Sequence, residues 1–259
     1  MATIAEHYAH CDALLKREDP DRWLAALFLP AETRKHVHAV YAFNLEIARI
    51  RRLVSEPVLG EIRFQWWREV LAGDRASEAE AHPVAAALRD TLNVHGLPAA
   101  PLQALVEARL FDLYGAPMPS IEALEAYARA TAGQLFQFAA AIIEKKSGTE
   151  LSETAASGGM AYAMTGLMRA LPWHATTGQV FLPKDLLDRH GVIVEAVQAG
   201  LDSPSLLTAL AELRGVVRGH LAKFQAAADA KTGAIAAVFL PVNLCVPYLK
   251  LMDKSSYAP

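Results

Sequence analysis

The stretch that decides the fold runs from Thr33 to Leu53 and reads TRKHVHAVYAFNLEIARIRRL. Its apolar residues recur at intervals of three and four, which places them on one stripe of an α-helix. The sequence therefore predicts an amphipathic helix that turns one face to the protein core. The stripe consists of Val37, Tyr41, Leu45 and Ala48.

Helical periodicity continues along almost the whole chain. Gly115–Pro119 is a breaker, and no alternating run of Val, Ile and Thr is long enough to suggest a sheet. Gly96 and Ser120 are residue types that end and begin helices. We expect an all-α protein of roughly eight to ten helices, folded as a single domain over residues 1–259. The further helices are expected at Ile62–Leu71, Pro83–Gly96, Leu102–Leu113, Ser120–Lys145, Thr154–Leu171, Pro204–Ala230 and Ala234–Leu251.

The composition excludes several classes of protein. Hydrophobic residues make up 53% of the chain and charged residues only 20%, which points to an extensive interior or an apolar cavity. The net charge of -3 argues against a nucleic-acid-binding protein, which normally has a basic excess. Cys11 and Cys245 are too far apart for a CxxC motif, so we expect two reduced thiols and no disulfide framework.

No stretch approaches the ~18 apolar residues of a membrane span. The first residues, MATIAEHYAHCDALLKREDP, have no apolar core typical of a leader peptide. We therefore expect a cytoplasmic location, with peripheral contact at the inner membrane left open.

One predicted helix has small residues on every face. The segment Ala155–Ala163 reads AASGGMAYA. Small faces let helices approach closely, and they also leave room for a lipid-sized guest. The sequence leaves both interpretations open.

Several segments occur in the order of the motifs of one known family. On these segments the chain resembles the squalene/phytoene synthase superfamily over roughly residues 8–250. The resemblance implies an isoprenoid-synthase-type helical bundle around a central cavity. The segments are Leu29–Asn44 (LLPxxxRxAxxxLYAFCR in the family), His82–Pro98, Leu124–Gly133 (ELxxYCxxVAG), Gly159–Arg169 (GxAxQLTNxLRD) and Val180–Asp185 (IYLPxD).

Active members of this family ionise an allylic diphosphate with the help of Mg²⁺. The diphosphate departs only when its charge is neutralised, and Mg²⁺ requires oxygen ligands. Two aspartates at i and i+4 place both carboxylates on one helix face. This geometry explains the two aspartate-rich motifs of the family.

Both motifs are degenerate in this chain. The first falls on Ala48, Arg49 and Arg52, and the second on Ala170, Trp173 and His174. Positions that would orient the diphosphate hold Ala163, Gly166, Asp21 and Arg22. The resemblance therefore implies a pseudoenzyme with no catalytic residues, no metal and no cofactor.

The replacing residues resemble one branch of the superfamily. Four segments are similar to the sequences of the aspartate-less branch that includes the mitochondrial complex I assembly factor and its alphaproteobacterial relatives. These segments are AFNLEIARIRRLVSE, RFQWW, MRALPWH and QVFLP. This resemblance implies a role in the assembly of NADH:quinone oxidoreductase, with subunits of that complex or other assembly factors as partners.

Two groups of residues are candidates for binding. The basic and aromatic segment can be a partner or membrane-interface surface, although core packing of at least one Trp is an open alternative. The Arg49–Arg52 run can be a solvated face or an anion site. The candidate partner surface is Arg63, Gln65, Trp66, Trp67 and Arg68; the candidate cavity and anion-binding residues are Arg34, Tyr41, Asn44, Arg52, Tyr127, Gln134 and Arg169.

Three functions are compatible with these observations. The favoured one is a non-catalytic assembly factor or chaperone for respiratory complex I, and a bound isoprenoid or lipid is compatible with it. The alternative is an active prenyltransferase that condenses farnesyl or geranylgeranyl diphosphate with Mg²⁺ held by unconventional ligands. The third is a protein that binds an isoprenoid or lipid without chemistry.

Overall fold

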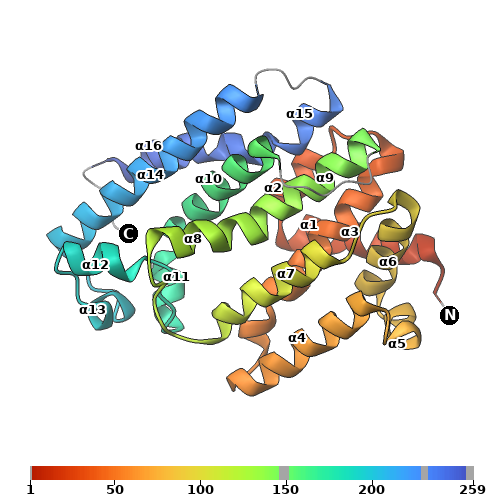
Figure 1. The fold of residues 1–259 in the computed structure, drawn as a ribbon, viewed down its shortest axis with the longest axis horizontal. Helices are drawn as coiled ribbons and strands as arrows, with labels where there is room; N and C mark the ends of the chain where they lie inside the picture. Colours follow the sequence, from red (N-terminus) through yellow and green to blue (C-terminus); the bar gives the residue numbers. More distant parts are fainter. Residues whose placement is uncertain (1, 146–151, 229–232, 255–259) are drawn as a thin grey trace. The chain divides into compact units, whose positions relative to one another are not determined.

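The computed structural model describes residues 2–145, 152–228 and 233–254, and they are helical almost throughout (Figure 1). Within these ranges the only strand-like feature is an isolated bridge between Met118 and Pro183. The structure therefore confirms the predicted all-α fold class. Over the same ranges, no helix combines the length and the apolar character needed to span a membrane.

The chain divides into two compact units, each built from segments that are separate in the sequence. The first unit contains Met1–Leu113, Gln134–Ser152 and Ala230–Pro241, and the second contains Tyr114–Gly133, Glu153–Asp229 and Val242–Pro259. The single-domain organisation stays a prediction, so each unit is described by itself.

In the first unit, α1, α3 and α6 pack on one another, and α3 also packs on α9. Phe43 and Phe64 are among its fully buried side chains. Its helices are α1 (Ile4–Glu18), α2 (Pro20–Ala26), α3 (Ala31–Ala48), η1 (Ile50–Leu53), α4 (Pro57–Ala72), α5 (Ala76–Ala81), α6 (Pro83–His95), α7 (Ala100–Arg109), η2 (Leu110–Leu113), α9 (Gln134–Glu144) and α15 (Ala234–Val238).

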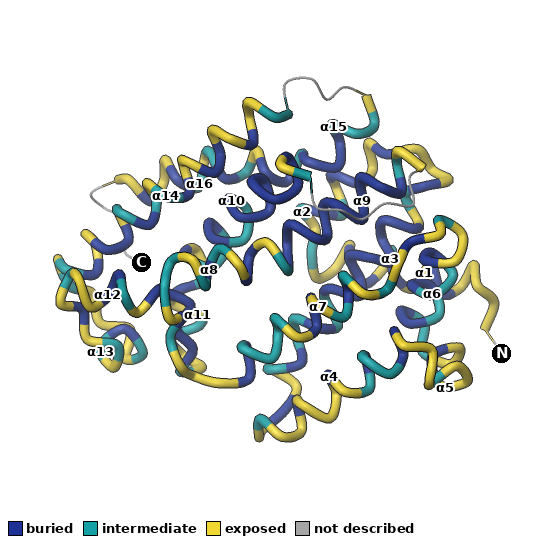
Figure 2. Tube along the Cα trace, in the orientation of Figure 1, coloured by how far each residue is buried: buried dark blue, intermediate teal, exposed yellow. Residues whose placement is uncertain are grey.

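The second unit is organised around α10, which packs on α14, α8, α16 and the π-helical turn η3. Figure 2 shows the first half of α10 buried on almost every face. Its helices are α8 (Ile121–Ala128), η3 (Arg129–Gly133), α10 (Glu153–Arg169), α11 (Leu171–Thr176), α12 (Lys184–Arg189), α13 (Val194–Gln198), α14 (Pro204–Ala228) and α16 (Cys245–Met252); η4 (Leu240–Leu244) contains the junction of the two units.

The predicted helix ends are partly confirmed. Gly96 ends α6 with a left-handed φ of 60°, and the Ser120 hydroxyl accepts from the amide of Ala123 at 3.2 Å. The expected number of helices is too low, because the described residues contain sixteen α-helices. Several of these have only five to seven residues, as α2 and α13 do, too short for a periodic pattern. Ala230, the expected end of α14, lies outside the described residues.

Two buried histidines each contact polar side chains inside the first unit. The Tyr8 hydroxyl donates to Asp90 at 2.6 Å and lies 2.9 Å from Nδ1 of His36. His38 lies 3.1 Å from a carboxylate oxygen of Asp12. Burial lowers the pKa of both histidines to about 4, because a charged imidazole loses its hydration there.

The free energy of unfolding is expected to fall as the pH drops below about 6.5, the ordinary histidine pKa. In the folded chain both pKa values are about 4, so the unfolded chain takes up protons first as the pH falls. The loss at about pH 5 is ~2 kcal/mol per histidine. Urea unfolding at about pH 7.5 and about pH 5 measures it, and His38→Gln should remove about half of the loss. Equal stability at both pH values would contradict this assignment.

Candidate functional site

The first degenerate motif lies where α3 ends. Ala48 is the last residue of α3, and Arg52 lies beyond it in η1. The Arg52 amide donates to the Arg49 carbonyl at 3.0 Å, which is the bond of a 3₁₀ turn. A 3₁₀ turn rotates roughly 120° per residue rather than 100°, so side chains four apart leave a common face. The expectation of one helix from Thr33 to Leu53 is therefore wrong at its C-terminal end.

A cation lies on the Tyr41 side of α3. The guanidinium carbon of Arg22 is 5.5 Å from the centre of the Tyr41 ring. Arg22 also pairs with Asp19 at 2.6 Å, and the two side chains are only 10% and 11% exposed. The opposite charges of this close pair largely cancel at longer range. Asp19, the carboxylate in this contact, is therefore occupied by Arg22 rather than available to a divalent cation.

The second degenerate motif, in the second unit, crosses the break between α10 and α11. Ala170 is the N-cap residue of α11, and His174 lies within α11. Pro172 accounts for the break, because it lacks an N–H and its ring would clash with the carbonyl four residues before it. The His174 ring packs against Trp173 and Phe181 at centroid distances of 5.1 Å and 4.7 Å. The predicted helix thus ends two residues before Leu171.

The residues at the two motifs do not fit a magnesium site. Mg²⁺ is held in proteins by carboxylate oxygens and water in octahedral geometry. No carboxylate occurs at any of the six motif positions. Among the described residues as a whole, no three His, Cys, Asp or Glu side chains are grouped to hold a metal ion.

Two candidate cavity residues of the first unit are engaged in internal contacts. The Nη2 atom of Arg34 donates to the carbonyls of Leu27 and Leu29, at the end of α2. The carbonyl oxygen of the buried Asn44 side chain accepts from Arg109 at 3.3 Å. Arg109 also pairs with Asp112 at 3.0 Å, and neither residue was a candidate from the sequence. Their i,i+3 spacing in an otherwise apolar segment is the signal that could have found them.

The other candidate cavity residues are divided between the units. In the second unit, the buried Tyr127 ring lies 6.0 Å from that of Phe181, and the Arg169 guanidinium lies 4.4 Å from the centre of the Tyr248 ring. Gln134 is buried in the first unit. A common site for these residues stays a prediction.

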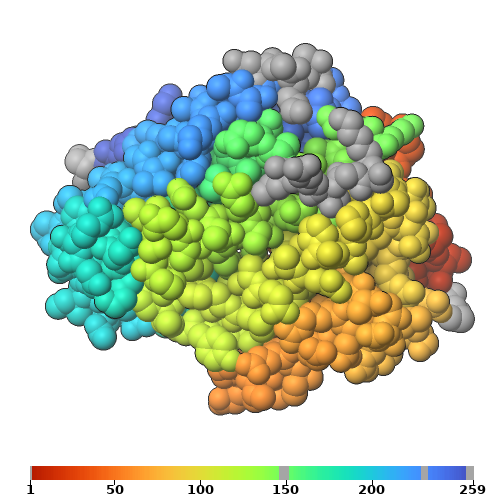
Figure 3. Space-filling view, in the orientation of Figure 1, coloured from red at the N-terminus to blue at the C-terminus, as the bar shows by residue number. Residues whose placement is uncertain are grey.

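The basic and aromatic segment lies on α4, which is uncovered on the face seen in Figure 3. Arg63 and Gln65 are exposed, while Trp66 and Arg68 are half-buried. Trp67 is only 4% exposed, and its ring packs edge-on against Phe43 at 5.2 Å. The open alternative, core packing of one Trp, therefore holds for Trp67.

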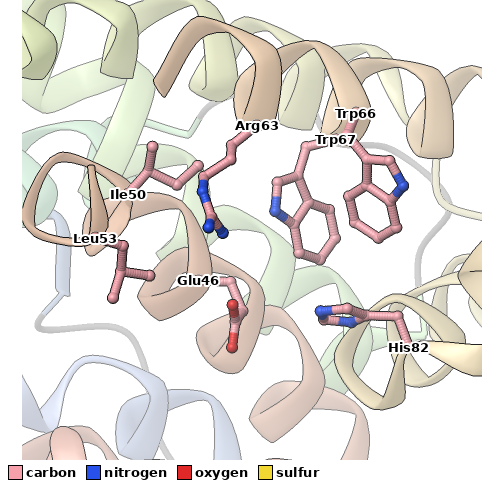
Figure 4. A pocket seen from close by; sticks show the side chains of 7 residues that line it. All are labelled: Glu46, Ile50, Leu53, Arg63, Trp66, Trp67 and His82. Carbon is pink, nitrogen blue, oxygen red and sulfur yellow. The ribbon is translucent and has the colours of Figure 1, made fainter. Parts of the chain in front are cut away.

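Two hollows flank this segment within the first unit, and Trp66 lines both. A pocket of about 210 Å³ lies between α4 and the α3–η1 segment (Figure 4). A more open groove of about 420 Å³ follows the outer side of α4. The pocket is lined by Glu46, Ile50, Leu53, Arg63, Trp66, Trp67 and His82, and the groove by Val58, Glu61, Ile62, Gln65, Trp66, Arg68, Glu69 and Arg75.

Comparisons with known proteins give both enzymes and an assembly factor. The model of the family described as squalene/phytoene synthase matches residues 15–258. Human "NADH dehydrogenase (ubiquinone) complex I, assembly factor 6" is 33% identical over 190 residues, 73% of this chain and 56% of that protein. This chain thus spans little more than half the length of that relative.

Two further matches are enzymes by name. The phytoene synthase of Thermus thermophilus is 29% identical over 213 residues, which cover 79% of this chain and 69% of the enzyme. The crystal structure of squalene synthase HpnC from Alicyclobacillus acidocaldarius superposes with a TM-score of 0.80 at 17% identity, covering 99% of this chain and 96% of the other. At that identity the likeness shows the fold alone.

Proposed function

The chain belongs to the squalene/phytoene synthase family, and we propose that it is a non-catalytic member that assists the assembly of respiratory complex I. The observation that carries this proposal is the state of both motif segments. Each lacks carboxylates, and each crosses a break in its helix, at Ala48 and at Ala170.

The chemistry of the family supports the non-catalytic part. Ionisation of an allylic diphosphate needs divalent cations that neutralise the leaving group. Arg52 lies on η1, where the first motif would need a carboxylate, and the nearby Asp19 of the same unit is already paired with Arg22. The six motif positions therefore lack the carboxylates that would recruit the metal.

The assembly role is supported by the relatives. Human complex I assembly factor 6 is 33% identical to this chain over 190 residues. The residues that replace the aspartates in this chain also resemble those of the assembly-factor branch. The match covers only 56% of that relative. The interaction with components of complex I is therefore a proposal for this chain.

We propose that the outer groove of α4 contacts the protein partner. Val58 and Ile62 are 58% and 62% exposed there. They lie among Gln65, Arg68 and Glu69, so apolar and charged groups alternate along one groove. Exposed apolar side chains within a polar rim are typical of protein–protein contact sites. An isoprenoid or lipid ligand and a peripheral position at the inner membrane belong to the same proposal.

Deletion of the gene is expected to lower assembled NADH:quinone oxidoreductase activity several-fold and to leave squalene, hopanoid and carotenoid levels unchanged. Membrane activity assays and lipid mass spectrometry measure the two effects. Re-expression of the wild-type chain should restore the complex. An Ile62→Asp chain should restore it poorly, because the charge falls in the groove.

Ile193→Asp is the matched control, since Ile193 is 65% exposed but lies in the second unit. It should restore the complex fully. Loss of a triterpene or carotenoid in the deletion strain, together with a normal respiratory complex, would show that the protein is an enzyme.

A further inference from the structure

The pocket between α4 and α3 is separate from the α3 face that holds the degenerate first motif. Glu46 and Ala48 are both on α3 and two residues apart, so their side chains point roughly 160–200° from each other. Glu46 lines the pocket, whereas Ala48 marks the degenerate motif. A ligand in this pocket would therefore not use the former active site.

A donor without a protein acceptor is available at this pocket. Trp67 is 4% exposed, and its indole N–H has no acceptor among the residues that the structure describes. Other indoles of the unit are satisfied: Trp66 donates to Glu78 and Trp23 donates to Asp12, each at 2.9 Å. The Trp67 nitrogen is not among the fully buried side-chain atoms that lack a partner, so its N–H is open to solvent and can donate to a ligand in the pocket.

Arg63 and His82 also favour a ligand that accepts hydrogen bonds. Figure 4 shows Arg63 reaching from α4 toward Glu46, with the Trp67 nitrogen on the same side. Within the described ranges, Arg63 pairs with no carboxylate. His82 accepts from the Ala85 amide through Nδ1 at 3.3 Å, so its proton is on Nε2. Burial lowers the pKa of His82, which keeps this ring a neutral donor.

The charges in the pocket favour an anion. One carboxylate oxygen of Glu46 pairs with Arg49 at 2.5 Å, so those two charges largely cancel. Arg63 then leaves an excess positive charge beside two neutral N–H donors. The second oxygen of Glu46 stays available to accept from a hydroxyl of the ligand.

The walls and rim favour an apolar chain attached to that anion. Ile50 and Leu53 line the pocket opposite the Trp66 and Trp67 rings. Leu53 is 52% exposed, so the apolar surface continues from the pocket to the solvent. A volume of about 210 Å³ far exceeds the ~10–15 Å³ that one water needs.

We propose that this pocket binds an amphiphilic phosphate anion. The phosphate lies against the Arg63 guanidinium and the Trp67 and His82 N–H groups, and the apolar chain leaves over Leu53. The inference deepens the lipid-binding part of the proposed function and needs no role in complex I assembly.

Titration of the purified chain with dihexanoyl phosphatidylglycerol, followed by tryptophan fluorescence and calorimetry, tests the proposal. We expect saturable binding below the micelle concentration. Arg63→Gln should weaken it at least about tenfold, as the loss of a charge-assisted hydrogen bond does. Trp67→Phe retains most of the packing and should weaken binding less, through the lost N–H alone.

Arg68→Gln is the matched control, because it removes the same charge from the same helix outside the pocket. Arg68 pairs with Glu107 at 2.7 Å and should leave binding unchanged. Melting temperatures verify that each variant is folded. Equal weakening by Arg63→Gln and Arg68→Gln, or the absence of saturable binding, would overturn the proposal.

Two other probes separate the sources of the phosphate. Inorganic phosphate lacks the chain, and dihexanoyl phosphatidylcholine has the same phosphate and chains with a compensating cation. Both should bind more weakly than the glycerol lipid. Equal or tighter binding of either would contradict an amphiphilic anion. If the lipid does not bind, the gene-deletion test of the assembly role still stands. If the deletion leaves the respiratory complex normal, the lipid-binding result still stands.

Discussion

Replacing Gly159 by alanine is expected to cost about 3 kcal/mol or more of folding free energy, at the upper end of overpacking substitutions. A Cβ on Gly159 would lie 2.3 Å from both Cα and N of Gly133, and 2.9 Å from the carbonyl carbon of Ala132. These are backbone atoms of η3 and cannot turn aside as a flexible side chain can. The usual benefit of alanine over glycine in a helix, about 1 kcal/mol, is too small to offset the clash.

Gly166→Ala is the matched control, because it makes the same change in the same helix. A Cβ there meets nothing within 4 Å, so the variant should gain up to about 1 kcal/mol. Urea unfolding of both variants against the wild-type chain gives the two differences. A Gly159→Ala chain as stable as the Gly166→Ala chain would show that α10 and η3 are not in close contact.

The same contact resolves one question that the sequence leaves open. The segment AASGGMAYA is compatible with close packing and with a cavity, because both need small side chains. In the structure, Gly159 meets the backbone of η3, and a Cβ on Gly158 would lie 2.8 Å from the Phe224 ring. Close packing therefore accounts for both glycines. Composition alone does not say which neighbour approaches a helix.

The fold class was predictable because helical periodicity is local, but the helix ends were less so. Gly96 and Ser120 act through their own backbone and side chain, so both caps could be read from the sequence. The end of α3 at Ala48 has no Gly or Pro signal, and the prediction ran on to Leu53. Pro172 did carry a signal, yet its clash reaches four residues back and ends α10 at Arg169.

The candidate binding residues show the same limit. The basic and aromatic composition of Arg63–Arg68 marked this segment as a binding candidate. Because the segment is helical, some of its residues line the pocket and others line the groove. The pocket also needs Glu46 and His82, which come from other helices. Their convergence is a tertiary contact that no spacing in one sequence reveals. The metal positions were assigned from the family motifs and stay a prediction, whereas Arg22 beside Tyr41 emerged only from the fold.

The purified chain is expected to form no condensation product from farnesyl or geranylgeranyl diphosphate, even with millimolar Mg²⁺. The motif positions offer no carboxylate, and Arg52 at one of them would repel the cation. Restoring aspartate at Ala48, Arg52, Ala170 and His174 should not restore turnover. Arg52 lies on a 3₁₀ turn, so the first pair of carboxylates would not share an α-helical face. The positions that would orient the diphosphate would still hold Ala163, Gly166, Asp21 and Arg22.

The size of this effect makes it decisive. An ordinary enzyme with a turnover number of about 1 per second would complete on the order of 10⁴ turnovers in roughly three hours. A chain without the metal site should complete fewer than about one, since positioning and charge neutralisation supply most of the acceleration.

The most direct test of the central claim is mass-spectrometric detection of squalene, dehydrosqualene and phytoene after incubation of the purified wild-type chain with each diphosphate and Mg²⁺. The account predicts no product above a protein-free blank. Product in molar excess over the protein would contradict it and would identify the chain as an active prenyltransferase.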